Sequence, residues 1–439
     1  ASQRAALDAQ KFDGGGYQVG IVPDGAGWFA VGGVANPDEL SSWCMAKLAE
    51  SLPEGTYRRA GGEPGPALHG WQTGQYVFDH YKKPERPVGP RVLLTKDVKA
   101  IDGALAEAQA VCLIRDLVNT PAEDMGPAAL EEQCEALAKT HAARLEVTRG
   151  DTLEQEYPMV HAVGRAAARH HAPRIMHLTW GKESNPVLAI VGKGVCFDSG
   201  GLDVKSNSGM LLMKKDMGGA AHAIALAGLV MAAHLPVRLH LLVPAVENAI
   251  SSNSFRPGDV LQTRKGLTVE IGNTDAEGRL ILGDALQRAS EENPELILDF
   301  ATLTGAARVA LGPEYPALMT RRDETAAALI AAGKAHDDEP WRLPLPDVYR
   351  EWLASDIADT KTRMAMPLRV PAWRGCSSTS SSAKGSTGRI STHSPGARRL
   401  NRAGPRAAKP TDCAPHGTCC RPVSGEAEGR PLAGKRGRG

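Results

Sequence analysis

Residues 273–280 read Asn-Thr-Asp-Ala-Glu-Gly-Arg-Leu, and no other stretch of the 439-residue chain places so many reactive side chains so close together. The octapeptide follows a strand-like run at residues 267–271 and precedes apolar residues at helical spacing, so we predict a strand-to-helix turn. Asp275 and Glu277 are two residues apart, and in extended backbone their side chains would point the same way. Two converging carboxylates repel each other, so the pattern indicates a bound cation.

The chain around the octapeptide alternates strand-like and helical patterns. Such alternation predicts an α/β fold with a mostly parallel sheet covered by helices on both faces, and ligands at the carboxyl ends of its strands. Lys193, Asp198, Asp275 and Thr302 all come just after predicted strands. The predicted elements of this region are strands at residues 187–191, 237–243 and 296–300 and a helix at residues 218–234.

The length of the chain is sufficient for two domains, each with its own hydrophobic core. We predict a small N-terminal α/β domain followed by a larger catalytic α/β domain. The predicted boundaries are 1–96 for the N-terminal domain, 97–118 for a connecting helix, 119–361 for the catalytic domain and 362–439 for a basic, low-complexity tail.

The composition is that of a soluble globular protein, with 42% hydrophobic and 23% charged residues. No apolar run is long enough to span a membrane, and the first residues lack the apolar core of a signal peptide. The eight cysteines are too sparse for a disulfide framework and fit reduced thiols. We therefore expect a cytoplasmic protein that does not bind membranes.

The tail differs from the rest of the chain in charge and composition. From residue 362 onward, fifteen Lys and Arg residues stand against three acidic ones, a net charge of +12, whereas the remainder carries −11. A composition rich in Arg, Ser, Pro and Gly cannot bury a core, so we predict a disordered or out-of-frame segment. Basic charge alone could attract nucleic acid, but no aromatic interleaving or recognition module supports such a partner.

A second cluster of charged residues lies upstream of the octapeptide. The segment 192–205 contains Lys193, Asp198 and Lys205 in a Gly-rich setting, and Asp216 follows shortly before Gly-Gly. Taken singly, Asp216 would be a helix N-cap and the lysines exposed charges. Taken together with the octapeptide they provide three Asp, one Glu and two Lys, a set that can bridge two divalent cations such as Zn²⁺, Mn²⁺ or Mg²⁺.

These motifs resemble the leucyl aminopeptidase (cytosol aminopeptidase) family, whose signature octapeptide is matched here residue for residue. The resemblance runs from about residue 119 to residue 359. Its further motifs are Phe-Asp-Ser-Gly-Gly at 197–201, Asp-Met-Gly-Gly-Ala-Ala at 216–221, Arg-Pro-Gly-Asp at 256–259 and Ala-Thr-Leu-Thr-Gly at 301–305.

The resemblance implies two divalent metal ions per subunit, Mn²⁺ or Zn²⁺. It places one metal on Lys193, Asp198, Asp216 and Glu277, and the other on Asp198, Asp275 and Glu277. Lys193 could bind only as the neutral amine, because an ammonium has no lone pair. By the same resemblance Lys205 and Arg279 are the catalytic residues, with a bicarbonate ion at Arg279 as general base.

The activity implied is that of a metallo-aminopeptidase, which releases N-terminal amino acids from peptide substrates with a water activated by the two metals. The resemblance assigns the side-chain pocket, which favours Leu-like residues, to Met213, Thr302, Leu303 and Gly305; Met213 and Leu303 could instead be ordinary core residues. It also implies a homohexamer. The alternative is a DNA- or partner-binding protein on the same scaffold, with reduced or no activity because the family's usual C-terminal end is replaced.

Overall fold

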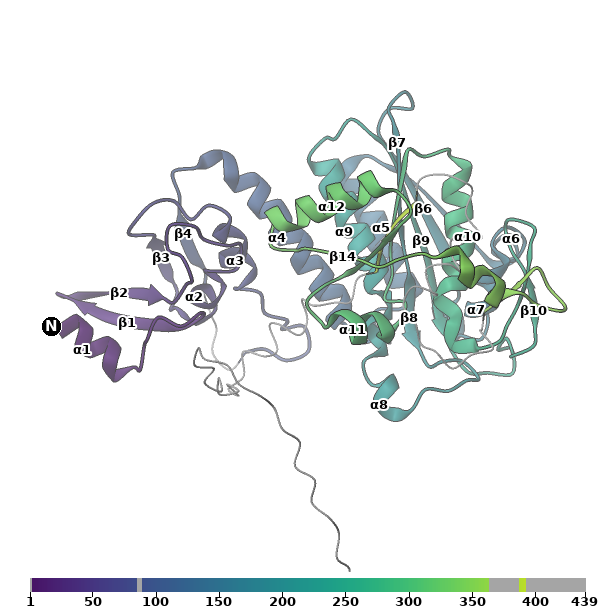
Figure 1. Ribbon diagram of the computed structural model, residues 1–439, viewed down its shortest axis with the longest axis horizontal. Helices are drawn as coiled ribbons and strands as arrows, with labels where there is room; N and C mark the ends of the chain where they lie inside the picture. Colours follow the sequence, from purple (N-terminus) through teal and green to yellow (C-terminus); the bar gives the residue numbers. More distant parts are fainter. Residues whose placement is uncertain (1, 85–88, 363–386, 392–439) are drawn as a thin grey trace, which may run out of the picture. The chain divides into compact units, whose positions relative to one another are not determined.

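The structure, a computed structural model, describes residues 2–84, 89–362 and 387–391 (Figure 1). Its N-terminal part is a small α/β domain, in agreement with the predicted fold class. The elements of this part are α1 Ser2–Ala9, β1 Val19–Asp24, β2 Gly27–Gly32, α2 Ala46–Ser51, β3 Gly55–Arg58, α3 Ala67–Thr73 and β4 Arg91–Leu94.

The N-terminal domain has its own hydrophobic core, built mainly from helices α2 and α3. Met45, Ala49, Leu52, Ala67 and Trp71 form this core. The indole N–H of Trp71 donates to the main-chain oxygen at the start of β4, at 2.8 Å, so the largest core side chain is also satisfied as a donor. β1 pairs with β2 antiparallel, and β3 pairs with β4 parallel.

Helix α4, Val98–Asn119, follows the N-terminal domain. It ends one residue after the predicted end of the connecting helix, because Pro121 disfavours helical backbone at the residue before it and Thr120 is extended, with ψ of 130°. Its last turns, with Leu117 and Val118, belong to the core of the larger domain.

The larger domain alternates strands with helices along the chain. Its elements are α5 Pro127–His141, β5 Arg144–Arg149, α6 Gly150–Glu156, α7 Pro158–Gly164, η1 Arg169–His171, β6 Arg174–Trp180, β7 Val187–Gly192, β8 Gly194–Asp198, α8 Asn207–Met210, η2 Met213–Met217, α9 Gly218–Ala232, β9 Arg238–Asn248, β10 Val260–Gln262, β11 Thr268–Glu270, η3 Thr274–Ala276, α10 Glu277–Glu291, β12 Leu296–Phe300, α11 Gly305–Leu311, β13 Ala317–Thr320, α12 Asp323–Ala335, β14 Trp341–Arg342, η4 Asp347–Leu353, β15 Thr360–Lys361 and β16 Thr387–Ser391.

Nine of the described strands form one sheet. Eight of them follow in the order β14-β13-β16-β12-β7-β9-β6-β5, and β8 pairs with the far end of β9. The centre is parallel, since β12, β7, β9 and β8 all run the same way, and β6 and β5 continue the sheet antiparallel to their neighbours. The prediction of a mostly parallel central sheet is confirmed.

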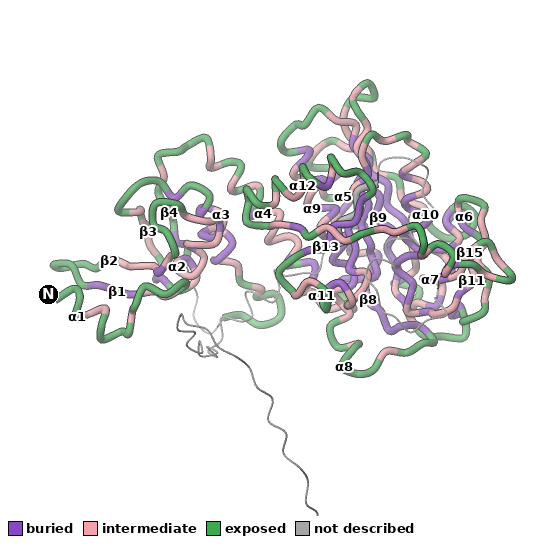
Figure 2. The backbone as a smooth tube through the Cα atoms, viewed as in Figure 1, coloured by how far each residue is buried: buried purple, intermediate pink, exposed green. Residues whose placement is uncertain are grey.

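Helices cover both faces of this sheet, which explains why its central strands are continuous apolar runs. In β7, Ile190 packs into a core with α4, α5 and α9, whereas Ala189 and Val191 on the opposite face pack with α7 and α10. β9 and β12 divide their side chains between the same two cores. Figure 2 shows the central strands as the most continuously buried part of the chain.

The predicted basic tail lies largely outside the described residues. Within it, however, residues 387–391 form β16, whose backbone pairs parallel with β12 and antiparallel with β13. For these five residues the structure differs from the predicted disorder, since strand pairing uses main-chain N–H and C=O groups that every composition except proline provides. No helix among the residues described is long and apolar enough to cross a membrane.

A buried carboxylate joins three segments of the larger domain. Asp284 of α10 is fully buried, and it accepts the main-chain N–H of Met159 at 2.8 Å and that of Arg264 at 2.9 Å. Met159 lies in the first turn of α7, a helix without a side-chain cap of its own. Asp284 therefore satisfies donors that the end of a helix leaves without intrahelical partners.

Replacing Asp284 by Leu removes the acceptor for two buried N–H groups, and we expect it to lower the free energy of unfolding by about 2–4 kcal/mol. Urea unfolding followed by far-UV circular dichroism measures this change. Asp284→Asn keeps one acceptor oxygen and should lose less. Equal losses in the two variants would contradict the role assigned to the carboxylate.

Candidate metal and catalytic site

The predicted site residues gather at the carboxyl edge of the central sheet. Lys193 directly follows β7, Asp198 is the last residue of β8, and Thr302 comes two residues after β12. Because β7, β8 and β12 run in the same direction, their carboxyl ends lie on one edge. A main-chain hydrogen bond joins the ends of β7 and β12: the N–H of Lys193 donates to the carbonyl oxygen of Phe300 at 2.9 Å.

Lys193 is a buried cation held by two carboxylates. Its Nζ lies 2.6 Å from Oδ2 of Asp216 and 2.9 Å from Oε1 of Glu277, and the residue is only 2% exposed. Gly278 makes this approach possible, since a Cβ at that position would lie 2.6 Å from Cε and 2.7 Å from Nζ of Lys193. The glycine of the octapeptide therefore provides the space that the lysine occupies.

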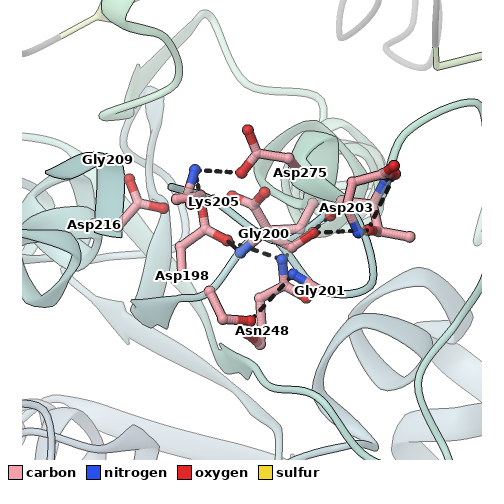
Figure 3. Close-up of polar contacts among 12 residues, drawn as sticks. Asp198, Gly200, Gly201, Asp203, Lys205, Gly209, Asp216, Asn248 and Asp275 are labelled. Atoms are coloured by element: carbon pink, nitrogen blue, oxygen red, sulfur yellow. Dashed lines mark hydrogen bonds and ion pairs between the residues drawn. The ribbon is translucent and has the colours of Figure 1, made fainter. Parts of the chain in front are cut away.

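Lys205 is the second cation of the cluster. Its Nζ lies 2.8 Å from Oδ2 of Asp198 and also pairs with Oδ1 of Asp275 (Figure 3). Asp198 comes from β8 and Asp275 from the turn before α10, so Lys205 bridges two segments that are distant in sequence. In this structure its ammonium group neutralises carboxylates that the resemblance assigns to a metal.

Asp216 is not the helix cap that its position before Gly218 suggests when it is considered alone. It lies in the 3₁₀ turn η2, and the N-cap position of α9 is Met217, which makes no side-chain cap. Oδ2 of Asp216 instead pairs with Lys193, and Oδ1 accepts the hydroxyl of Thr302 at 2.7 Å. The carboxylate is therefore turned toward the cluster.

The expectation of extended backbone between Asp275 and Glu277 is wrong. Asp275 lies in η3, whereas Glu277 is the first residue of α10, with φ of −63° and ψ of −39°. The two side chains nevertheless converge with that of Asp198, and oxygen atoms of the three carboxylates lie within 4.8 Å of one another. The side chains therefore converge through a tight turn into a helix, and not through the alternation of side chains along a strand. The side chain of Asn273 stabilises this turn by accepting the N–H of Asp275 at 2.7 Å.

The electrostatics of the cluster follow from burying several like charges together. Burial, followed by repulsion from Asp198, raises the pKa of Glu277 to about 8. The same two causes raise the pKa of Asp275. Burial opposes charge on Lys193 as well, but Asp216, Glu277 and Asp198 outweigh it and raise its pKa, so the amine is an ammonium here.

The donor set fits divalent cations. Two lysines would neutralise only half of the charge that the four carboxylates carry when all are ionised, and Oε2 of Glu277 is buried without a hydrogen-bond partner among the described residues. An orphaned buried oxygen on a group with a raised pKa indicates a missing positive charge. Oxygen ligands from carboxylates suit Mn²⁺, Mg²⁺ or Zn²⁺, and Lys193 could join them as a neutral amine.

The remaining predicted residues lie around this cluster. Arg279 is buried in the first turn of α10, and its NH1 group donates to the carbonyl oxygen of Thr362 at 3.2 Å. Met213 opens η2, the turn that also carries Asp216. Leu303 packs partly against the core under α10, and Gly305 is the exposed first residue of α11.

Sequence reasoning missed the polar residues that hold together the loops carrying Asp198 and Asp275. Asn248, at the end of β9, bonds to Asp198, and Thr274 and Asp203 bond to each other through main-chain and side-chain atoms. Thr274 also donates its hydroxyl to the carbonyl oxygen of Gly200 at 2.7 Å. The available signal for Asn248 was its position, a lone amide at the carboxyl end of an apolar strand.

Family models match almost the whole described chain. The model described as "Cytosol aminopeptidase family, catalytic domain" matches residues 112–376, and that described as "M17 aminopeptidase, N-terminal domain" matches residues 1–94. The first match therefore extends 15 residues beyond the predicted end of the catalytic domain.

Two curated relatives illustrate the similarity. A probable cytosol aminopeptidase of Leifsonia xyli subsp. xyli is 38% identical over 379 residues, which are 81% of this chain and 75% of that protein. A peptidase B of Pectobacterium carotovorum subsp. carotovorum is 44% identical over 254 residues, 56% of this chain and 58% of that protein. The chain thus spans between just over half and three quarters of the length of these relatives.

Solved structures show the same similarity in three dimensions. A cytosol aminopeptidase from Coxiella burnetii superposes with a TM-score of 0.84 at 42% identity, covering 89% of this chain and 86% of that one. The bottromycin maturation enzyme BotP in complex with Mn superposes with a TM-score of 0.80 at 31% identity, covering 88% of each chain.

The contact between Gly278 and Lys193 leads to a test of the packing in the site. Gly278→Ala would force the buried lysine away from its carboxylates, and we expect a loss of about 1–3 kcal/mol in the free energy of unfolding despite the better helix propensity of alanine. Gly305→Ala is the matched control, because a Cβ there meets no atom within 4 Å. Urea unfolding measures the free energy of unfolding of both variants. An unchanged value for Gly278→Ala would show that Lys193 can move away from its carboxylates without cost.

Proposed function

The chain belongs to the cytosol aminopeptidase family of hydrolases, and from this premise we propose that it is a metallo-aminopeptidase that releases N-terminal residues, preferentially Leu-like ones, from peptides. The observation that carries the proposal is the cluster of Lys193, Asp198, Asp216, Asp275 and Glu277, in which every residue except the partly exposed Asp275 is buried and Oε2 of Glu277 has no hydrogen-bond partner among the described residues.

The proposed cofactors are two divalent cations per subunit, Mn²⁺ or Zn²⁺. The complex of the similar enzyme BotP with Mn supports Mn²⁺ as one candidate. Lys193, Asp198, Asp216 and Glu277 would hold one ion, and Asp198, Asp275 and Glu277 the other. Bound there, the ions supply a water of lowered pKa and polarise the scissile carbonyl.

The protein's own residues then position and stabilise the reacting groups. Lys205 carries a positive charge at the rim of the cluster, between Asp198 and Asp275. An N–H of its ammonium that is turned to the scissile carbonyl oxygen would stabilise the negative charge that this oxygen gains during attack. Asp198 and Asp275 hold the ammonium in that place.

Arg279 is the proposed binding site of the general base. Its guanidinium is buried and always charged, and it can hold a planar anion such as bicarbonate with two parallel N–H groups. The contact with the carbonyl oxygen of Thr362 orients the guanidinium from one side. Arg279 would hold this anion, which would supply a general base next to the proposed metal ligands.

Met213, Thr302, Leu303 and Gly305 are the proposed walls of the side-chain pocket. Thr302 also donates its hydroxyl to Asp216, so it would link the pocket to the metal ligands. Gly305 leaves open space where another residue would project a side chain. An apolar slot of this kind favours Leu-like residues over charged ones.

A homohexameric assembly and a cytoplasmic location complete the proposal, and both rest on membership of the family. The alternative of a DNA- or partner-binding protein is not favoured, since the relatives reported above are named as aminopeptidases or peptidases.

The activity is tested by the hydrolysis of a leucyl chromogenic amide with added Mn²⁺ or Zn²⁺. We expect turnover that a chelator abolishes, and thermal stabilisation by Mn²⁺ of about 2.7 kcal/mol at a concentration one hundred times Kd. Glu277→Gln removes a shared ligand and should abolish both effects. Lys205→Met should lower kcat by about 10²–10³-fold while the protein still binds Mn²⁺.

Glu291→Gln is the control for Glu277→Gln, because Glu291 forms a partly exposed ion pair with Arg264 at the far end of the same helix. It should leave turnover unchanged. A folded wild-type protein that binds Mn²⁺ but hydrolyses no aminoacyl amide would count against the aminopeptidase proposal.

The pocket is tested by Gly305→Leu. A leucine at this exposed, open position should not destabilise the fold, but it should narrow the side-chain pocket. We expect kcat/KM for the leucyl substrate to fall about tenfold more than for the alanyl substrate. Parallel losses for both substrates would remove Gly305 from the pocket.

A further inference from the structure

Asn248 occupies a special position in the sheet. It is the last residue of β9, and it is the register partner of Asp198 at the end of β8. The residue is completely buried, so its amide can form hydrogen bonds only with groups of the protein. Figure 3 shows Asn248 and Lys205 on opposite sides of Asp198.

The amide of Asn248 joins two loops that each carry metal ligands. Its Nδ2 group donates to Oδ1 of Asp198 at 2.9 Å and to the main-chain oxygen of Thr274, the residue before Asp275, at 3.2 Å. Both partners are acceptors only, so the NH₂ group must face them and the reverse orientation is excluded. A neutral side chain with two N–H donors is what this position requires.

The main chain of Asn248 holds the same loop a second time. Its carbonyl oxygen accepts the N–H of Ser199 at 3.2 Å and the hydroxyl of Ser199 at 2.6 Å. Asp198 is thus followed by a residue fixed to the end of β9. The loop after β8 cannot shift along the sheet without breaking these bonds.

The bond from Asn248 also decides which oxygen of Asp198 faces the cluster. Oδ1 accepts both the Asn248 amide and the N–H of Gly200, each at 2.9 Å. The other oxygen, Oδ2, pairs with the ammonium of Lys205. The amide therefore fixes the rotation of the carboxylate.

Gly201 closes the space on the other side of the amide. Its φ is +64°, and a Cβ there would lie 3.0 Å from Oδ1 of Asn248 and 2.9 Å from Oγ1 of Thr274. Oδ1 of Asn248 has no hydrogen-bond partner among the described residues. The orientation of the amide is therefore set by its two donor bonds and by this close packing.

We propose that Asn248 is a positioning residue of the metal site: by bonding Asp198 and the carbonyl of Thr274 with one amide, it sets the separation between Asp198 and the Asp275–Glu277 turn and thereby the affinity for the metal pair. This inference rests on the proposed metal site. Asn248 is not one of the proposed metal ligands.

The test is a titration of the purified full-length chain with Mn²⁺ alone, in which the electron paramagnetic resonance signal of free Mn²⁺ counts bound ions. Asn248→Leu is similar in size but donates no hydrogen bond, and we expect it to weaken the binding of at least one of two ions by about 10–100-fold. Asn248→Ser retains one donor and should show an intermediate loss. Thermal unfolding without metal measures the stability of each variant.

Ser254→Ala is the matched control. Ser254 is buried in the loop after β9 and bonds only to that loop in the described structure, through the carbonyl oxygen of Ala249 and the N–H of Ser251. It should lose stability but bind Mn²⁺ as the wild type does.

Wild-type affinity for both ions in a folded Asn248→Leu protein would overturn the proposal. So would a failure of both Asn248 variants to fold while Ser254→Ala folds, because Asn248 would then be a structural residue. Absence of Mn²⁺ binding by the wild type would instead reject the metal site itself, and with it this inference.

Discussion

The gathering of four carboxylates, three of them buried and that of Asp275 partly exposed, at one edge of a sheet is the constraint on which the rest of this structure depends. Asp198, Asp216, Asp275 and Glu277 would repel one another strongly in a medium of low dielectric constant. Lys193 and Lys205 offset half of that charge, each by bridging two carboxylates. Burial, followed by repulsion from Asp198, raises the pKa of Glu277, and the negative charge that the lysines leave is what a bound cation would neutralise.

Apolar cores cover both faces of the sheet beneath the cluster, so the charged residues lie at the ends of its strands. β7, β9 and β12 contribute side chains alternately to the two cores, which leaves the strand ends free for polar residues. Close approaches require residues without side chains. Gly278 admits Lys193, and Gly201 packs beside the amide of Asn248.

The gathering of the charged residues could be predicted from the octapeptide and segment 192–205, because these residues lie close together in sequence and follow recognisable strands. The local geometry was predicted less well. Asp275 and Glu277 converge through a 3₁₀ turn and a helix start rather than through extended backbone. Asp216 resembles a helix cap in sequence, but in the structure its carboxylate pairs with the ammonium of Lys193 and accepts the hydroxyl of Thr302.

By itself the sequence determined the α/β class, the alternation of strands and helices and the set of charged groups that must share one site. Only the tertiary structure decided which atoms meet. The pairing of Asp198 with Asn248 depends on the register between β8 and β9, and the contact of Lys193 with Gly278 depends on the placement of β7 against α10. Such contacts join residues 50 or more positions apart, and no periodicity within one segment records the register of another.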